Sequence, residues 1–326
     1  MRVDDMKKSS GFFNYMSANS QSSLFRNGKV LTRRDISGSD AGSVGIHLEK
    51  YEKNVLNARD SLSIEGIKLD KQGFELFPSK LGKKDINFFN NQQVIKTYYS
   101  HCAELIKEVT GARSVLAFDH NIRSAIGKKS KRMISGGQQV QGPAHIVHGD
   151  YTLTSGPERL RQLSKPPGKN DTLRSVLGTL NSLLPIDTVN DALSNGRFAI
   201  INLWRNIVLD PVEINPLALC DASTVSPQDL VVFEIHYADR VGENYFAKHS
   251  LKHDWYFYDR MTRDEALLIK QWDSEGVLAR TNGRSFDSEF SHKPCTFSFH
   301  SAFEDPNTRE DAADRWSMEV RCIVIY

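Results

Sequence analysis

The 326-residue sequence predicts a mainly β fold, a barrel or jelly roll with flanking helices. Short segments with a two-residue apolar period fill the C-terminal two thirds of the chain, and helical patterns lie before and between them. This arrangement favours a barrel over a doubly wound sheet. The sequence has no Gly-rich dinucleotide fingerprint and no phosphate-binding loop, which disfavours nicotinamide or nucleotide chemistry.

The predicted strands alternate apolar and polar residues or consist of short runs rich in β-branched and aromatic residues. They cover residues 112–118, 198–205, 229–236, 255–258, 295–300 and 316–326, and a further strand carries His148. Residues 127–142, rich in Gly, Lys and Gln, predict a mobile surface loop just before the His148 strand.

Three segments have helical patterns. Residues 85–111 place apolar side chains at helical spacing, with Asp85 as the N-cap and Gly111 as the stop. Residues 159–196 are also helical in pattern, and Asn195-Gly196 ends them. The sequence Thr262-Arg-Asp-Glu265 has the spacing of a capping box and predicts a short helix through Lys270.

The domain organisation follows from composition. Residues 1–45 are rich in Ser, Asn, Gly and charge, which predicts a partly irregular N-terminal arm. Residues 46–326 are expected to form a single domain, with a helical insertion near residues 160–196.

Charge and hydropathy limit the classes of partner. Lys plus Arg number 42 and Asp plus Glu 40, so the formal net charge is +2 and gives no electrostatic reason to expect nucleic acid or an anionic membrane. No apolar run approaches the roughly 18 residues of a membrane helix, and the first ten residues are polar. We therefore expect a soluble, cytoplasmic protein.

The four cysteines are scattered. They form no Cys-x-x-Cys pair, which argues against structural zinc and against a disulfide framework. We expect buried thiols at Cys102, Cys220, Cys295 and Cys322.

His148-Gly-Asp150 and His300 supply the three ligands of one kind of metal site. In an extended segment residues i and i+2 point to the same side, so His148 and Asp150 can hold one ion while Gly149 lets the backbone come close. Two histidines and one carboxylate leave the remaining positions of an octahedral metal open, which suits Fe(II) enzymes. Taken alone the triplet is weak evidence, and a lone histidine at a strand end is more often an ordinary surface residue.

The last predicted strand carries a polar line. Arg315, Ser317, Glu319 and Arg321 alternate with apolar residues. An Arg with a neighbouring hydroxyl binds a carboxylate well, because the guanidinium donates two parallel charge-assisted hydrogen bonds and the Ser donates a third. A sheet face turned towards water explains the alternation equally well.

Five segments together resemble the non-haem Fe(II)/2-oxoglutarate-dependent oxygenases, and specifically the hydroxylase/desaturase group related to cephamycin 7-alpha-hydroxylase and fungal gibberellin desaturase. The segments are Phe118–Arg123, His148–Thr152, Asn202–Arg205, Pro216–Asp221 and Arg315–Arg321. The resemblance runs from about residue 45 to the end. It implies a double-stranded β-helix (jelly roll, cupin-like) core that uses Fe(II), 2-oxoglutarate and O₂ and releases succinate and CO₂.

The same resemblance implies roles for individual residues. His148, Asp150 and His300 would hold Fe(II), and Arg315 with Ser317 would bind 2-oxoglutarate. Further residues that could line the site or contact the substrate are Arg123, Tyr151, Asn202, Trp204, Arg205 and Arg321, although Trp204 fits core packing better. The gap between Asp150 and His300 is long for the superfamily, which suggests inserted helices over the mouth.

The expected reaction is oxidation of an unactivated C–H bond in a small natural-product intermediate, by hydroxylation, desaturation or ring formation. Two alternatives remain at this point: a catalytically inactive jelly-roll module that binds small molecules, and a zinc hydrolase that uses the same three ligands. The sequence leaves the substrate unidentified, and it leaves open whether the protein is a monomer or a homodimer.

Overall fold

The computed structural model describes residues 8–34, 40–60, 66–81, 86–237, 240–290 and 292–326. Among these residues the strands form two sheets, with the order β1-β4-β12-β9-β14-β7-β11-β10-β2-β3 in the larger and β5-β13-β8-β15-β6 in the smaller. The larger sheet contains β1 (Lys8–Met16), β2 (Leu31–Arg34), β3 (Asp40–Val44), β4 (Leu48–Asn57), β7 (His148–Gly149), β9 (Leu217–Cys220), β10 (Leu230–His236), β11 (Val241–Ala247), β12 (Trp255–Phe257) and β14 (His300–Ala302). The smaller contains β5 (Phe74–Pro78), β6 (Ser114–Arg123), β8 (Phe198–Asn206), β13 (Glu265–Asp273) and β15 (Ser317–Ile325).

The two sheets pack face to face around an apolar interior. Phe74 and Trp204 of the smaller sheet share one buried cluster with Leu219 of the larger sheet. Alternation along the strands produces this arrangement, because every second side chain points between the sheets. The expected mainly β jelly-roll core is confirmed.

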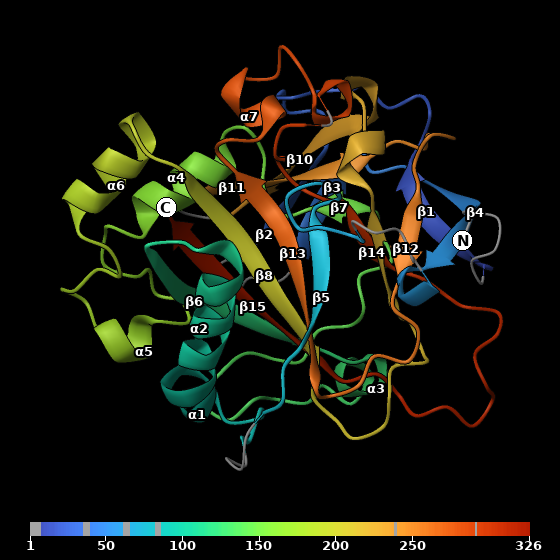
Figure 1. Cartoon of the computed structure of the whole chain (residues 1–326), viewed down its shortest axis with the longest axis horizontal. Coiled ribbons are helices and arrows are strands. Elements are labelled where there is room, and N and C mark those ends of the chain that lie inside the picture. Colours follow the sequence, from blue (N-terminus) through green and yellow to red (C-terminus); the bar gives the residue numbers. More distant parts are fainter. Residues whose placement is uncertain (1–7, 35–39, 61–65, 82–85, 238–239, 291) are drawn as a thin grey trace.

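The helices cover the edges and outer faces of the sheets (Figure 1). They are α1 (Asn91–Gln93), α2 (Tyr99–Thr110), α3 (Ala125–Lys129), α4 (Ser155–Gln162), α5 (Arg174–Leu177), α6 (Ile186–Ser194) and α7 (Val277–Arg280), and a π-helical turn (Val94–Tyr98) joins α1 to α2. Helix α2 packs on β6, β15 and β8. None of the helices in the described ranges is long and apolar enough to cross a membrane.

The helix expected over residues 85–111 begins later than its pattern suggests. Asn90 is the N-cap, and its side chain accepts a hydrogen bond from the backbone N–H of Gln93 at 3.0 Å. The expected cap, Asp85, lies outside the described residues. Gly111 ends α2 in the left-handed conformation (φ 65°), as expected from its position.

Residues 262–270 do not form the predicted short helix. The backbone N–H and the hydroxyl of Thr262 do donate to the carboxylate of Glu265, at 2.8 and 3.0 Å, so the local contacts of a capping box exist. The chain nevertheless continues as β13, because Glu265–Asp273 pairs with β5 on one side and β8 on the other. Pairing and burial between two strands outweigh the local preference.

The predicted strand 295–300 is mostly irregular, and only His300 opens a strand, β14. Its backbone hydrogen bonds go to separate segments: the N–H of Cys295 donates to Asp70 and that of Ser298 to Lys270. The residues remain buried, as their apolar character predicts. The four cysteines are buried free thiols, as expected.

The N-terminal arm is more regular than expected, because β1, β2 and β3 belong to the larger sheet. Strand β1 pairs antiparallel with β4 along its whole length. Tyr15 anchors it, since its hydroxyl accepts from the indole N–H of Trp255 at 2.9 Å and lies 3.2 Å from Nδ1 of His253. The expected helical insertion contains α4, α5 and α6, although Leu180 between α5 and α6 is exposed.

Arg205 lies on the outer face of β8, where it stabilises the packing of helix α2. Its guanidinium donates to the hydroxyl of Tyr98 at 2.8 Å and to the carbonyls of Ser79 and Arg263, both at 2.6 Å. We predict that Arg205→Met lowers the free energy of unfolding by about 3 kcal/mol, because several charge-assisted hydrogen bonds are lost and buried carbonyls lose their donor. Urea unfolding measures this change.

The control is Arg161→Met on α4, where the side chain is half exposed. We expect it to change stability by less than about 0.5 kcal/mol. If Arg205→Met left stability unchanged but impaired catalysis, Arg205 would be a functional residue of the active site and not a packing residue.

Candidate active site

His148, Asp150 and His300 converge where β7 pairs with β14. His148 and His300 are direct cross-strand partners, and their ring centroids lie 4.3 Å apart. Asp150 Oδ1 lies 3.7 Å from Nε2 of His148 and 3.9 Å from Nε2 of His300. One ligand atom from each residue falls within 4.8 Å of the others, a spacing that could hold one metal ion.

The local backbone orients this group. Nδ1 of His148 lies 2.8 Å from the carbonyl of Ile146, which fixes Nδ1 as the donor and leaves Nε2 as the free acceptor. At position 149 an added Cβ would lie 3.0 Å from the ring of Phe297, so glycine allows the close approach.

Burial and neighbouring charges hold the three residues in the protonation states that a metal needs. Burial, with a further contribution from His300, lowers the pKa of the His148 imidazole to about 4. Burial also lowers the pKa of His300. Burial alone would raise the pKa of Asp150, but the positive charge of Arg321, together with the neighbouring histidines and the hydrogen bond from Asn202, outweighs it and holds that pKa below its usual range. Two neutral imidazoles and one carboxylate fit Fe(II) in both number and type.

The second oxygen of Asp150 is held by the smaller sheet. Asn202 Nδ2 donates to Asp150 Oδ2 at 3.0 Å, and Arg321 Nε lies 3.4 Å from the same oxygen. Arg321 also forms ion pairs with Asp119 at 3.1 Å and with Glu319 at 2.7 Å. Asp150 therefore presents Oδ1 to the histidines and Oδ2 to the groups that fix its orientation.

Arg315 and Ser317 form a second polar group at the start of β15, and both are buried. Arg315 Nη1 donates to the carbonyl of Asn215. Among the described residues, Arg315 Nε and the Ser317 hydroxyl have no hydrogen-bond partner. Burial lowers the pKa of Arg315 to about 9, and the nearby charge of Arg123 contributes. Unsatisfied buried donors are costly, and a bound carboxylate would satisfy both of these.

A family described as Oxidoreductase/YMDC permease-like domain matches residues 13–325. The chain is 29% identical over 303 residues to the hydroxylase/desaturase efuI of Hormonema carpetanum, covering 87% of this chain and 88% of that protein. It is 30% identical over 229 residues to the Fe(II)/2-oxoglutarate-dependent dioxygenase nvfI of Aspergillus novofumigatus, covering 70% of this chain and 66% of that protein.

The chain belongs to the Fe(II)/2-oxoglutarate oxygenases of the hydroxylase/desaturase group. The family resemblance of the sequence is thereby confirmed. The fold agrees, because the solved iron and alpha-ketoglutarate-dependent endoperoxidase NvfI superimposes with a TM-score of 0.69 at 22% identity, covering 98% of this chain and 97% of that one.

The other residues that the sequence predicted to line the site differ in how close they lie to Asp150 and Arg315. Asn202 and Arg321 contact Asp150, and Arg123 is close enough to lower the pKa values of both His148 and Arg315. Trp204 lies in the buried core with its ring 5.7 Å from the guanidinium of Arg315. Tyr151 lines a pocket, whereas Arg205 points to the opposite face of the sheet.

Asp119 and Gln271 were missed by the sequence analysis. Asp119 binds Arg321, and Gln271 Oε1 accepts from the backbone N–H of Asp150 at 3.2 Å. One sequence pattern could have indicated Asp119. Asp119, Asn121 and Arg123 alternate with buried residues in β6, and this alternation matches the polar line of the neighbouring β15.

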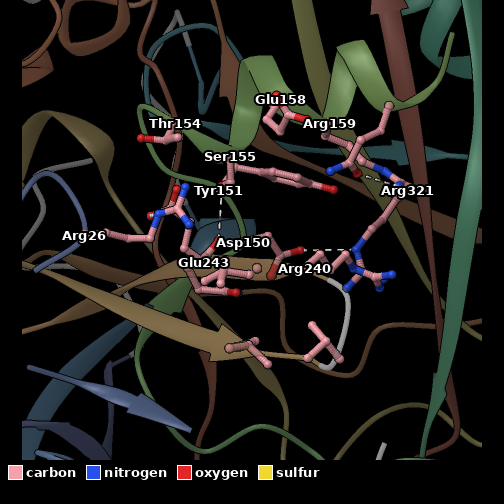
Figure 2. A pocket seen from close by; sticks show the side chains of 16 residues that line it. Arg26, Asp150, Tyr151, Thr154, Ser155, Glu158, Arg159, Arg240, Glu243 and Arg321 are labelled. Carbon is pink, nitrogen blue, oxygen red and sulfur yellow. Dashed lines mark hydrogen bonds and ion pairs between the residues drawn. The ribbon is translucent and has the colours of Figure 1, made fainter. Parts of the chain in front are cut away.

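The pocket of the oxygenase is about 240 Å³ in volume and reaches Asp150 and Arg321 (Figure 2). Residues of α4 and β11 form much of its wall. Of the residues His148, Asp150 and His300, Asp150 lines this pocket.

We predict that Asn202→Ala weakens Fe(II) binding about tenfold, because Asp150 loses the hydrogen bond that fixes Oδ2. Anaerobic Fe(II) titration measures the dissociation constant. Asn206→Ala on the same strand is the control, since Asn206 donates to the carbonyls of Asp210 and Met261 and not to Asp150. Equal Fe(II) affinity in both variants would contradict a role for Asn202 in orienting Asp150.

Proposed function

We propose that His148, Asp150 and His300 hold Fe(II) in this oxygenase, and that Arg315 with Ser317 binds the distal carboxylate of 2-oxoglutarate. The convergence of the three ligand atoms within 4.8 Å is the observation that carries the proposal. When bound, iron and 2-oxoglutarate supply the activation of O₂ that oxidises an unactivated C–H bond and yields succinate and CO₂.

The chain's own residues would place these groups and keep water away. Asn202 and Arg321 hold the Asp150 carboxylate from the side opposite the histidines. Arg315 Nε and the Ser317 hydroxyl would each gain the acceptor that they lack, so co-substrate binding would remove an energetic cost already present in the fold. Burial of both groups between the sheets makes each charge-assisted hydrogen bond stronger than it would be in water.

We further propose that the substrate is a small natural-product intermediate and that the enzyme acts in the cytoplasm, as a monomer or a homodimer. The relatives support the first point, since they carry the names hydroxylase/desaturase and dioxygenase. Hydroxylation, desaturation and ring formation all remain compatible with the site, because they share the first step at the substrate C–H bond.

The iron ligands are tested by His148→Ala, Asp150→Ala and His300→Ala. Each variant should lose bound iron and Fe(II)-dependent succinate formation while keeping a folded far-UV spectrum, because an open three-ligand site contributes more to function than to stability. Iron content and succinate are measured together. His292→Ala, at an exposed histidine, is the matched control and should keep both. If one of these variants kept the wild-type iron content, the substituted residue would not be an iron ligand. Formation of product without oxygen would favour a hydrolase.

The co-substrate assignment is tested by Arg315→Met and Arg321→Met. We expect Arg315→Met to raise the apparent constant for 2-oxoglutarate about a hundredfold with Fe(II) binding near normal, because one buried charged partner of the carboxylate is lost. Arg321→Met should instead weaken Fe(II) binding, since Arg321 contacts Asp150. Ser317→Ala, a milder change, should raise the same constant about tenfold. The reverse ranking of the two Arg variants would move the carboxylate site to Arg321.

A further inference from the structure

We propose that the substrate carries a carboxylate, which Arg159 and Arg240 bind in the pocket beside Asp150. This inference rests on the proposed function, because it identifies the pocket as the place where the substrate meets the iron site. It adds a substrate class and two specificity-determining residues to that function.

The pocket is unusually polar for a small-molecule site. Its lining contains Arg26, Asp150, Tyr151, Thr154, Ser155, Glu158, Arg159, Gln162, Ile235, Tyr237, Arg240, Val241, Gly242, Glu243, Asn244 and Arg321. Apolar aliphatic side chains contribute only two of these residues, Ile235 and Val241. Such a wall suits a ligand with its own polar or charged groups better than a purely hydrocarbon one.

Two of the four pocket arginines are already neutralised. Arg321 forms ion pairs with three carboxylates, among them that of Asp150. Arg26 lies 3.6 Å from the carboxylate of Glu243. The third acid of the wall, Glu158, pairs at 3.7 Å with Arg161, which lies outside the pocket lining.

Within the described residues, Arg159 and Arg240 are paired less closely than the other two arginines. Arg159 Nη1 forms only a long ion pair, with Asp171 at 3.9 Å, and donates a hydrogen bond to the neutral amide of Gln162 at 3.2 Å. Arg240 stacks on the ring of Tyr237 at 4.6 Å, and no ion pair joins it to another residue of the described ranges. The pocket therefore holds two guanidinium groups that a bound carboxylate would contact at hydrogen-bonding distance, closer than their present ionic partners among the described residues.

Arg159 is held in place before any ligand binds. Its guanidinium packs over the ring of Phe118 at 4.7 Å, and its side chain is 20% exposed. The phenol of Tyr151 points towards Arg159 and Arg321 (Figure 2). A partly buried, pre-oriented guanidinium binds a planar carboxylate through two parallel hydrogen bonds with little loss of side-chain freedom.

The experiment measures binding without turnover. The protein is loaded with Mn(II) in place of iron and saturated with 2-oxoglutarate, and the proton line widths of added probes are followed by NMR. The probes are matched pairs, hexanoate with hexanamide and 3-phenylpropanoate with 3-phenylpropanamide. Zn(II)-loaded protein is the diamagnetic control, so that broadening caused by Mn(II) reports a probe close to the metal.

We expect the carboxylates to be broadened by Mn(II) and to bind about tenfold more tightly than their amides. Arg159→Gln and Arg240→Gln should each reduce carboxylate affinity about tenfold, and Arg159→Lys should retain part of it. Arg113→Gln removes the same charge at an exposed arginine whose partner, Asp191, also lies outside the pocket lining, and should stay within about twofold of the unaltered protein.

Three results would overturn the anion site: amides binding as tightly as carboxylates, Arg159→Gln matching Arg113→Gln, or no Mn(II) broadening of any carboxylate. Failure of the proposed function gives a different result. In that case Fe(II)-loaded wild-type protein forms no succinate from 2-oxoglutarate, whereas the Mn(II) measurement still reports whether carboxylates bind.

Discussion

The carboxylate of Asp150 is contacted by both sheets, and the geometry of the site depends on this double contact. His148 and His300 approach one oxygen from the larger sheet, and Asn202 and Arg321 approach the other from the smaller sheet. A relative shift of the sheets would therefore separate Asp150 from one set of partners. The placement of the three proposed metal ligands therefore depends on the packing of the apolar interior, and the dense core keeps the sheets in register.

The interior polar groups show how charge is distributed around this point. Arg321 is bound by Asp119, Asp150 and Glu319 together, whereas Arg315 has only the carbonyl of Asn215 as a hydrogen-bond partner among the described residues. Arg321 therefore lies among three carboxylates at one end of the polar line of β15, whereas Arg315 at the other end forms no ion pair with the described residues. Such a separation suits a cation at the Asp150 end and a carboxylate at the Arg315 end.

Local spacing predicted part of this site, and strand pairing determined the rest. His148 and Asp150 lie two residues apart, so an extended backbone alone places them on one side. The same rule separates Asn202, which faces Asp150, from Arg205, which faces α2, although the sequence analysis grouped the two. The ion pair of Asp119 with Arg321 depends on the register of β6 against β15, which includes an irregularity beside Arg321. No pattern within either strand determines that register.

The pocket wall and the proposed metal ligands come from different parts of the fold. His148 and His300 belong to paired strands in the interior, whereas Arg159 lies on α4 and Arg240 lies just before β11. Changes in α4 or at the start of β11 can thus alter what binds without moving His148, Asp150 or His300. If the proposed carboxylate site is correct, Arg159 and Arg240 are for this reason better guides to the substrate of this oxygenase than the proposed metal ligands, whose geometry serves any substrate oxidised at an iron centre.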